Sequence, residues 1–373
     1  MAEINHINLV ATTLEGLESA LEAELKALGA FHTQARLRAV EFVAAQQDLD
    51  NIVSYNRLAL RIMHPISEFS IRSGDQLYAK AKAIDWSKWL DPEKTFAIDT
   101  TVRTDLYRHT KYPAMLLKDA ICDQQREQFN KRSSIDVEEP HLRIQLQVFD
   151  QRVRVLADLV GRPLFKRGYR RYSGGAPLNE VLAAGLIQLS GWEVGKESFY
   201  DPMTGSGTLL AEAALLAQKI PHRKPGGRWP FQRWSGFMSQ RDRPEGQPEK
   251  PQFIEGADLE YDRVNEARKN LDFAGLYYTP RVQQADFFKD PAPDCEPGVM
   301  IINPPYDERL SLESDLAFYA AIGDTLKRNY KGWKVWIFSG NKEAMKNIGL
   351  RTAKRLNLKN GPIECRFYRY DMF

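Results

Sequence analysis

The most specific chemistry in this sequence lies in the tetrapeptide NPPY, which runs from Asn303 to Tyr306. It follows Val299–Ile302, an apolar run with the pattern of a buried strand. Its two prolines fix the backbone dihedral φ and carry no amide donor, so the turn is rigid and offers carbonyl acceptors. The side-chain oxygen of Asn303 and the carbonyl of Pro304 can accept hydrogen bonds from an amine, and Tyr306 offers a ring for stacking a planar base. These groups suit holding an exocyclic amine with its nitrogen lone pair toward an electrophile; the alternative is a structural proline turn.

A second candidate site is the sequence DPMTGSGT at residues 201–208, where a short apolar strand ends and a helical pattern begins. Gly205 and Gly207 let the backbone approach a ligand where a Cβ atom would clash. Open α/β sheets bind ligands at such carboxyl ends of strands. The loop is not a Walker A motif, and Leu210 replaces the third glycine of a dinucleotide-binding fingerprint. A plain tight turn is the alternative interpretation.

Two acids follow the next two strand patterns. Asp258 comes directly after Phe253–Ala257 and could accept hydrogen bonds from ribose hydroxyls, although many acids at this position are loop residues or helix caps. Asp262 competes for that role, but it fits better as a negative charge at a helix N-terminus. Asp286, after Val282, could accept a hydrogen bond from the amine of an adenine, or it could belong to a solvated turn.

Basic residues concentrate in the second half of the chain. Residues 1–165 carry 21 basic and 23 acidic side chains, whereas Lys219–Arg243 carries seven basic side chains and one acid, interleaved with aromatic residues. Lys327–Phe373 carries twelve basic side chains and three acids. Backbone attraction combined with aromatic stacking holds single-stranded or flipped nucleotides, while a solvated surface is the usual alternative. We predict RNA contacts at Arg167, Arg170, Arg171, Arg228, Trp229, Arg233 and Trp234.

Length and composition exclude several classes of protein. A chain of 373 residues suggests two or three domains, and 43% hydrophobic with 27% charged residues excludes global disorder. The net charge of 52 − 49 = +3 does not by itself imply a nucleic-acid partner. Three separated cysteines exclude a disulfide scaffold, and the six histidines show no metal-ligand spacing, so we predict no metal site. The start lacks the basic region of a signal peptide and no apolar run could span a membrane, so we expect a cytoplasmic protein without a membrane partner.

Periodicity divides the chain into an α+β region over residues 1–160, a basic linker over 161–175 and an α/β domain over 176–373 with a mainly parallel sheet. In the first region the patterns predict helices at Thr12–Gly29, Gln47–Arg61, Leu77–Ile84 and Ala114–Phe129, and strands at Ile7–Ala11, Leu37–Val43, Phe96–Val102, Leu142–Phe149 and Val153–Leu159. The last two strands are predicted to form a hairpin around Asp150 and Gln151. In the last region they predict strands at Phe199–Tyr200, Phe253–Ala257, Val299–Ile302 and Val335–Phe338, and helices at Asn179–Leu189, Gly207–Gln218, Arg263–Ala274 and Ala317–Asn329.

The order DPMTGSGT, GADLEYD, QADFF and NPPY resembles a class I S-adenosylmethionine-dependent methyltransferase that acts on an exocyclic amine. The sequence APLNE at 176–180 and the GRW…W stretch at 227–234 are more narrowly similar to the THUMP-domain RNA guanine-N2 methyltransferases. The resemblance is to the RlmL-type 23S rRNA enzymes, including proteins once named N6-adenine-specific DNA methylases. It implies a Rossmann-like catalytic domain preceded by a ferredoxin-like and THUMP RNA-binding region at 1–160.

The resemblance also implies roles for individual residues. Asp258 would hold the ribose of S-adenosylmethionine and Asp286 its adenine amine, while Asn303, Pro304 and Tyr306 would hold the target base during direct in-line methyl transfer. Asn303 would also contact the cofactor. The remaining cofactor-binding residues would be Asp201, Met203, Gly205, Gly207, Asn179 and Glu180.

The chain departs from the family pattern in two places. Thr204 stands where the family usually has Cys in the loop, which is a change between side chains of similar size. The chain ends at Phe373, so the second methyltransferase half that makes 7-methylguanine in enterobacterial relatives is not expected.

The expected partner is RNA, in particular 23S rRNA or a pre-ribosomal particle. The NPPY turn does not distinguish guanine N2 from adenine N6, so an adenine-N6 methyltransferase acting on DNA or RNA remains an alternative. A tRNA guanine-N2 methyltransferase is another, and a non-catalytic RNA-binding assembly protein is a third.

Overall fold

The computed structural model describes residues 5–172, 178–222, 228–234, 237, 253–305 and 312–373. Its contacts divide the chain into two compact units. Unit 1 comprises Met1–Thr12, Glu22–Leu164 and Arg223–Asp242, and unit 2 comprises Thr13–Leu21, Phe165–His222 and Arg243–Phe373. The division therefore runs through helix α1 (Glu18–Ala27) and gives each unit segments that are distant in sequence.

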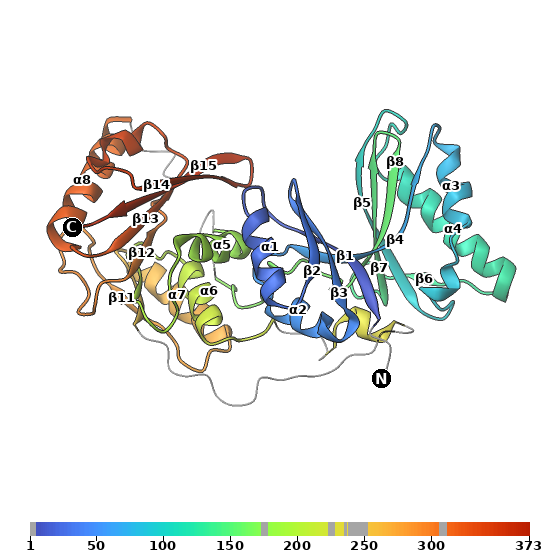
Figure 1. The fold of residues 1–373 in the computed structure, drawn as a ribbon, viewed down its shortest axis with the longest axis horizontal. Coiled ribbons are helices and arrows are strands. Elements are labelled where there is room, and N and C mark those ends of the chain that lie inside the picture. The colour runs from blue at the N-terminus through green and yellow to red at the C-terminus, as the bar shows by residue number, and fades with distance from the viewer. Residues whose placement is uncertain (1–4, 173–177, 223–227, 235–236, 238–252, 306–311) are drawn as a thin grey trace. The chain divides into compact units, whose positions relative to one another are not determined.

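Unit 1 is an α+β structure built on one eight-stranded sheet in the order β2-β3-β1-β4-β8-β7-β5-β6 (Figure 1). Its strands are β1 (His6–Thr12), β2 (Phe31–Arg36), β3 (Ala39–Ala45), β4 (Arg61–Ser70), β5 (Thr95–Arg103), β6 (Ser134–Ile135), β7 (Leu142–Phe149) and β8 (Arg152–Asp158). Its helices include α2 (Leu49–Tyr55), α3 (Asp75–Lys82) and α4 (Tyr112–Phe129), with short 3₁₀ turns η1 (Gln46–Asp48) and η2 (Trp86–Lys88). The predicted α+β class of this region is confirmed.

The connections in unit 1 follow from the local sequence. β7 and β8 form the predicted hairpin, and Asp150 in its turn has φ 50°, a conformation that Asp adopts more readily than most residues. β5 and β7 pair in parallel because the long helix α4 carries the chain back between them.

Two helix predictions in unit 1 were wrong at their boundaries. The first helix begins at Glu18 rather than Thr12, because Gly16 adopts φ 93° and its N–H donates to the carboxylate of Glu18 at 2.8 Å. The second helix, predicted over Gln47–Arg61, ends at Tyr55, and Arg61 instead begins strand β4, which the periodicity did not reveal.

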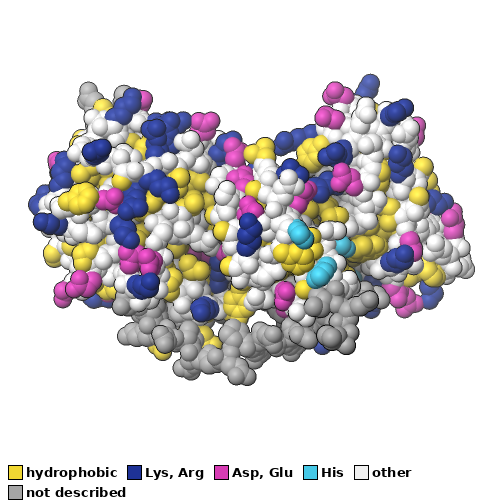
Figure 2. Space-filling model, in the orientation of Figure 1, with side chains coloured by type: hydrophobic (Ala, Val, Ile, Leu, Met, Phe, Trp, Pro, Cys, Tyr) yellow, Lys and Arg dark blue, Asp and Glu magenta, His cyan; other side chains and the backbone are white. Residues whose placement is uncertain are grey.

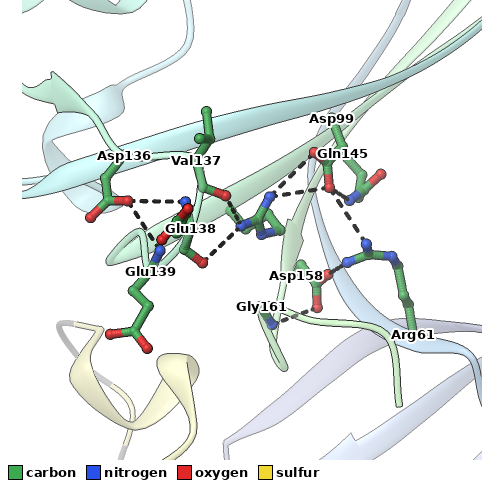
Figure 3. Close-up of polar contacts among 10 residues, drawn as sticks. Arg61, Asp99, Asp136, Val137, Glu138, Glu139, Gln145, Asp158 and Gly161 are labelled. Atoms are coloured by element: carbon green, nitrogen blue, oxygen red, sulfur yellow. Dashed lines mark hydrogen bonds and ion pairs between the residues drawn. The ribbon is translucent and has the colours of Figure 1, made fainter. Parts of the chain in front are cut away.

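A polar network crosses four neighbouring strands of the unit 1 sheet (Figure 3). The guanidinium of Arg61 on β4 pairs with Asp158 on β8 and lies 3.5 Å from the carboxylate of Asp99 on β5. From β7, Gln145 donates to Asp99 at 2.8 Å and Arg143 lies 3.3 Å from it. Burial raises the pKa of Asp158, which has no exposed surface, and Arg61 opposes that rise. These contacts tie the strands together inside the sheet.

The segment around 228–237 packs into unit 1 although it follows unit 2 residues in the chain. It contains the short 3₁₀ helix η4 (Pro230–Arg233). The Trp229 indole donates to the Ser54 hydroxyl at 3.2 Å, and the Trp234 indole donates to the His141 carbonyl at 3.2 Å. Both indoles are buried, with 1% and 7% of their surface exposed. The interpretation of Trp229 and Trp234 as stacking surfaces for RNA is therefore wrong, since neither ring has a free face in this structure.

Unit 2 is an α/β structure with a seven-stranded sheet in the order β11-β10-β9-β12-β13-β15-β14. Its strands are β9 (Phe199–Asp201), β10 (Ile254–Asp258), β11 (Arg281–Gln284), β12 (Val299–Ile302), β13 (Lys334–Ser339), β14 (Lys354–Asn360) and β15 (Ile363–Asp371). Its helices are α5 (Glu180–Ser190), α6 (Thr208–Ala217), α7 (Tyr261–Phe273) and α8 (Leu312–Asn329), with the 3₁₀ helix η5 (Ala344–Ile348). Five strands are parallel, and β15 is antiparallel to both of its neighbours, as expected for a mainly parallel sheet.

Helices cover both faces of the unit 2 sheet. On one face, Ile322 and Leu326 of α8 pack on alternate strand residues such as Ile302, Ile337 and Tyr370. On the other face, α5 contacts β12, and α6 contacts β9 and β10. This arrangement leaves the carboxyl ends of the parallel strands for the candidate site.

Candidate functional site

Three side chains predicted to bind ligands follow the adjacent strands β10, β9 and β12. Asp258 and Asp201 end β10 and β9, and Asn303 follows β12 directly. β9 pairs in parallel with β10 on one side and with β12 on the other. The chain runs outward from β9 to β11 and then crosses back to β12, so β9 and β12 flank the point where the strand order reverses. Ligands of open α/β sheets bind at this position.

The loop after β9 is held by backbone hydrogen bonds. The Thr204 N–H donates to the Ala257 carbonyl at 2.9 Å, and the Gly207 N–H donates to the Thr204 carbonyl at 2.8 Å. Gly207 has φ 82°, and a Cβ atom there would lie 3.0 Å from the Cβ of Ala267 on α7. Gly205 has φ 53°, and no described atom lies within 4 Å of where its Cβ would stand. Gly207 is therefore needed for packing, whereas Gly205 leaves open space for a ligand.

The two acids of this site differ in their environment. Asp201 is 1% exposed, and its carboxylate accepts a hydrogen bond from the Met203 N–H at 3.3 Å. Burial, with a smaller contribution from the charge of Asp258, raises the pKa of Asp201 to about 7, although the hydrogen bond from the Met203 N–H opposes that rise. The Asp258 carboxylate accepts from the Gly205 N–H at 2.9 Å and the Glu260 N–H at 3.0 Å, one on each oxygen. A carboxylate has about four lone-pair sites, so acceptor capacity remains for hydroxyl groups.

Asp262 lies in the first turn of α7, which agrees with its interpretation as a charge at a helix N-terminus. Asp286 lies in the turn after β11. Its carboxylate accepts from the Phe288 N–H at 2.9 Å and lies 2.9 Å from the Lys289 ammonium, and the hydrogen bond from Lys289 lowers its pKa. The role of Asp286 toward an adenine amine therefore stays a prediction.

The side chain of Asn303 carries the most informative observation in the site. Its Oδ1 atom is buried and accepts no hydrogen bond from any residue that the structure describes. A buried amide oxygen without a donor costs about 1–3 kcal/mol, so such an atom marks a place where a ligand donor belongs. The predicted base-stacking residue Tyr306 lies outside the described residues.

Asn179 and Glu180 have structural roles that the sequence pattern did not show. Asn179 is the N-cap of α5, and its Oδ1 accepts from the Val181 and Leu182 N–H groups at 2.9 and 3.3 Å. Glu180 is buried and lies 3.2 Å from the guanidinium of Arg170. Burial raises the pKa of Glu180, and Arg170 opposes that rise. Their contribution to cofactor binding stays a prediction.

The linker arginines do not form the free basic surface that we expected. Arg167 is buried with its Nε 3.3 Å from the Glu212 carboxylate, so its assignment to RNA is wrong. The charge of Arg170 is balanced by Glu180. The guanidinium of Arg171 lies 3.9 Å from the ring centre of Phe273. Arg171 is exposed, as are Arg228 and Arg233 in unit 1, and their RNA contacts stay predictions.

Sequence patterns missed one residue that shapes the loop. Asn270 on α7 has no exposed surface. Its Oδ1 accepts from the Arg171 and Tyr172 N–H groups, both at 3.0 Å, and its Nδ2 donates to the Tyr172 and Ser206 carbonyls at 2.7 and 2.9 Å. Asn270 therefore joins the linker to the glycine loop. A polar residue in the middle of a helical apolar stripe was the available signal.

The described part of the chain bears on two expectations, those for a metal site and for a membrane span. There, no three His, Cys, Asp or Glu side chains gather as a metal ion would require. Among the same residues, no helix has the length and apolar character to cross a membrane.

Comparison with known proteins agrees with this geometry. Family models match an RMKL-like methyltransferase domain at residues 167–369, a THUMP domain at 72–158 and an RlmL ferredoxin-like domain at 8–63. The chain is 35% identical over 98% of its length to ribosomal RNA large subunit methyltransferase K/L of Syntrophotalea carbinolica, and it spans about half (54%) of that enzyme. It is 34% identical to a Synechocystis sp. protein that carries the name of an RNA methyltransferase (slr0064), over 97% of this chain and 96% of that one.

Two solved structures share the fold along nearly the whole chain. The SMU.472 methyltransferase, complexed with SAH, has a TM-score of 0.85 and 26% identity and covers 99% of this chain and 98% of that one. A protein of Clostridium difficile 630 described as a possible methylase has a TM-score of 0.86 and 25% identity, covering 99% of both chains. The resemblance inferred from the four motifs is confirmed, and the chain belongs to the RMKL-like methyltransferase family with an N-terminal RlmL ferredoxin-like and THUMP region.

Proposed function

We propose that this protein is an S-adenosylmethionine-dependent RNA methyltransferase that modifies N2 of a guanine in 23S rRNA. The observation that carries the proposal is the buried Oδ1 atom of Asn303, which lies beside the end of β9 and has no hydrogen-bond partner among the described residues. The THUMP match and the names of the two relatives support RNA as the substrate, and the K/L enzyme supports the large-subunit rRNA.

The residues at the strand ends fit S-adenosylmethionine. The space at Gly205 admits a ligand close to the backbone, and the half-buried Asp258 keeps acceptor capacity for ribose hydroxyls. Asp201 and Met203 line the start of the same loop. When bound, S-adenosylmethionine supplies an electrophilic methyl group.

The residues of the chain act on the base amine by position. Oδ1 of Asn303 and the carbonyl of Pro304 are acceptors for the two N–H groups of an exocyclic amine. With both N–H groups held, the nitrogen lone pair is left free to point out of the plane of the base. Such orientation and fixed dipoles can supply the catalysis without a covalent intermediate.

Replacing Asn303 tests this function. We expect Asn303→Ala to lower kcat by about 10²–10³-fold, the usual cost of removing one preorganised hydrogen-bonding group, while S-adenosylmethionine still binds in a calorimeter. Asn347→Ala, at an Asn exposed on η5, is the matched control and should keep full activity. Turnover by Asn303→Ala equal to that of wild type would exclude the proposed role.

The substrate is tested by nucleoside mass spectrometry on 23S rRNA, 16S rRNA and tRNA from cells that lack the gene. Loss of N2-methylguanosine from 23S rRNA alone, restored by the wild-type gene but not by Asn303→Ala, is the expected result. Loss of N6-methyladenosine, or of N2-methylguanosine from tRNA, would reassign the target.

A further inference from the structure

The last part of unit 2 carries an excess of positive charge. Residues 341–371 hold eight basic and three acidic side chains. Four of the basic side chains form ion pairs, namely Lys346 with Glu343, Lys342 with Glu364, Arg369 with Asp371 and Lys359 with Glu15. No ion pair joins the other four, Arg351, Lys354, Arg355 and Arg366, to any residue within the described ranges. Figure 2 shows Lys and Arg side chains gathered over the region where Figure 1 draws β13 to β15.

This charge lies on a hairpin at one edge of the sheet. β14 and β15 pair antiparallel, and β15 also pairs with β13, so β14 is the edge strand. Directly opposite residues of an antiparallel pair lie on the same face. Asn357 is opposite Arg366, and Arg366 is opposite Ser339. Arg355 lies two residues from Asn357 and therefore shares that face.

The strand register places Arg366 near the end of β12 from which the amine-holding turn leaves. Ile302, the last residue of β12, pairs with Ile337, and Ser339 lies two residues further toward that end of the sheet. Arg366 is opposite Ser339 on the next strand. Neighbouring strands lie about 4.8 Å apart, so β15, two strands from β12, runs about 10 Å from it at the end where Asn303 and Pro304 follow.

The position of Arg366 is not explained by protection of the sheet edge. Charged residues on an edge strand prevent pairing with another chain, and Arg355 on β14 could serve that purpose. Arg366 lies on the inner strand β15, between β13 and β14. There its charge adds to those of Lys342 and Lys359, which pair with Glu364 and Glu15. The hydrogen bond from Lys342 is the main cause that lowers the pKa of Glu364. Three cations beside two carboxylates leave a net positive charge.

We propose that this surface, formed by Arg366 and Arg355, binds the RNA phosphates next to the target nucleotide. The inference rests on the proposed function, because it needs a base held at Asn303 and Pro304. An enzyme that flips a base must hold the flanking backbone, and the planar guanidinium suits a phosphate because it can donate two parallel hydrogen bonds. Arg366 contacts the nearest phosphate, and Arg355, further out on β14, contacts the next.

The salt dependence of RNA binding tests the proposal. In vitro transcribed 23S rRNA is titrated with the full-length protein at several salt concentrations. We expect Arg366→Gln to weaken binding about tenfold and to reduce the slope of log K against log salt by about 1, since one phosphate contact is lost. Arg355→Gln, at an exposed position, should reduce the slope similarly. Arg366→Lys should keep the wild-type slope.

Arg281→Gln is the matched control. Arg281 lies on β11, at the opposite edge of the same sheet, with 69% of its side chain exposed. The Arg281→Gln variant loses the same charge as the other two variants. Its affinity for RNA and its slope of log K against log salt should both equal those of the wild type. The same slope in Arg366→Gln, Arg355→Gln and wild type would overturn the inference.

Methyl transfer by the wild type separates the two proposals. If the wild type methylates 23S rRNA while both Arg→Gln variants bind RNA like the wild type, the inference fails and the function stands. If the wild type methylates no RNA but the two variants lose affinity and slope as expected, the function fails and the phosphate contacts stand.

Discussion

At the scale of single residues, burial determines the chemistry of the site. Asp201 and Asn303 follow neighbouring strands, and each places a polar group where water does not reach. An acid in such a place holds its proton more tightly, and an amide oxygen there needs a donor. Both conditions favour a bound ligand with hydrogen-bonding groups of its own.

The raised pKa of Asp201 makes stability depend on pH. Its pKa is about 7 in the folded protein against 3.8 ordinarily, so the folded state binds the proton more tightly than the unfolded state. The protonated Asp201 therefore contributes to the stability of the folded state. That contribution is fully present below about pH 4 and is lost as the pH rises to about 7. Between pH 5 and 8 the loss is about 3 kcal/mol of unfolding free energy. Asp201→Asn should remove this loss.

Urea unfolding of the cofactor-free protein at pH 5 and pH 8 measures this effect. All other titrating groups are common to the wild type and Asp201→Asn, so the difference between the two proteins reports Asp201 alone. The free energy of unfolding of Asp201→Asn should increase relative to that of the wild type as the pH rises. A constant difference at both pH values would contradict the raised pKa.

At the scale of elements, helix α7 fixes the shape of the glycine loop. Ala267 packs where Gly207 has no side chain, and Asn270 bonds to the loop and to the linker. The loop therefore depends on a helix that follows it by some 50 residues.

Asn270→Ala should damage both stability and cofactor binding. It removes four hydrogen bonds and leaves backbone groups unpaired, which should cost about 2–4 kcal/mol of unfolding free energy and weaken S-adenosylmethionine binding about tenfold. Asn56, equally buried in unit 1, provides a comparison. Asn56→Ala should lower stability but leave cofactor affinity unchanged, as measured by calorimetry. Equal cofactor affinities in the two variants would show that Asn270 has no specific effect on the shape of the glycine loop.

At the scale of the whole molecule, the chain does not divide at a single point. Thr13–Leu21 packs in unit 2, and the described residues Arg228–Trp234 pack in unit 1. The predicted linker at 161–175 therefore separates two regions along the sequence, whereas the contacts divide the chain at several positions.

Replacing Trp229 tests whether the segment around it belongs to the core of unit 1 or to a surface that binds RNA. Because its indole is buried, Trp229→Ala should lower the free energy of unfolding by about 3–5 kcal/mol and lower Tm in scanning calorimetry. The exposed neighbour Arg233 is the control, and Arg233→Ala should change stability by less than about 0.5 kcal/mol. An unchanged Tm in Trp229→Ala, together with weaker RNA binding, would restore the RNA interpretation.

The elements that sequence predicted well are those with strong local signals. Ala114–Phe129 and the hairpin around Asp150 were located within about two residues, because a long amphipathic pattern and a tight turn are properties of neighbouring residues. Strand β4 was missed because its buried residues do not alternate regularly. The start of α1 was misplaced because the positive φ of Gly16 is not visible in the pattern.

The sequence by itself determined the family and the chemical types in the site, because motifs are short and their side chains carry their chemistry wherever they lie. Only the tertiary structure decided which side chains are accessible. It buried Arg167, Trp229 and Trp234, which charge and aromatic content had marked as RNA contacts, and it placed Arg366 two strands from β12, near the end where the turn begins. Burial and strand register depend on contacts between segments far apart in the chain, so a local pattern cannot specify them.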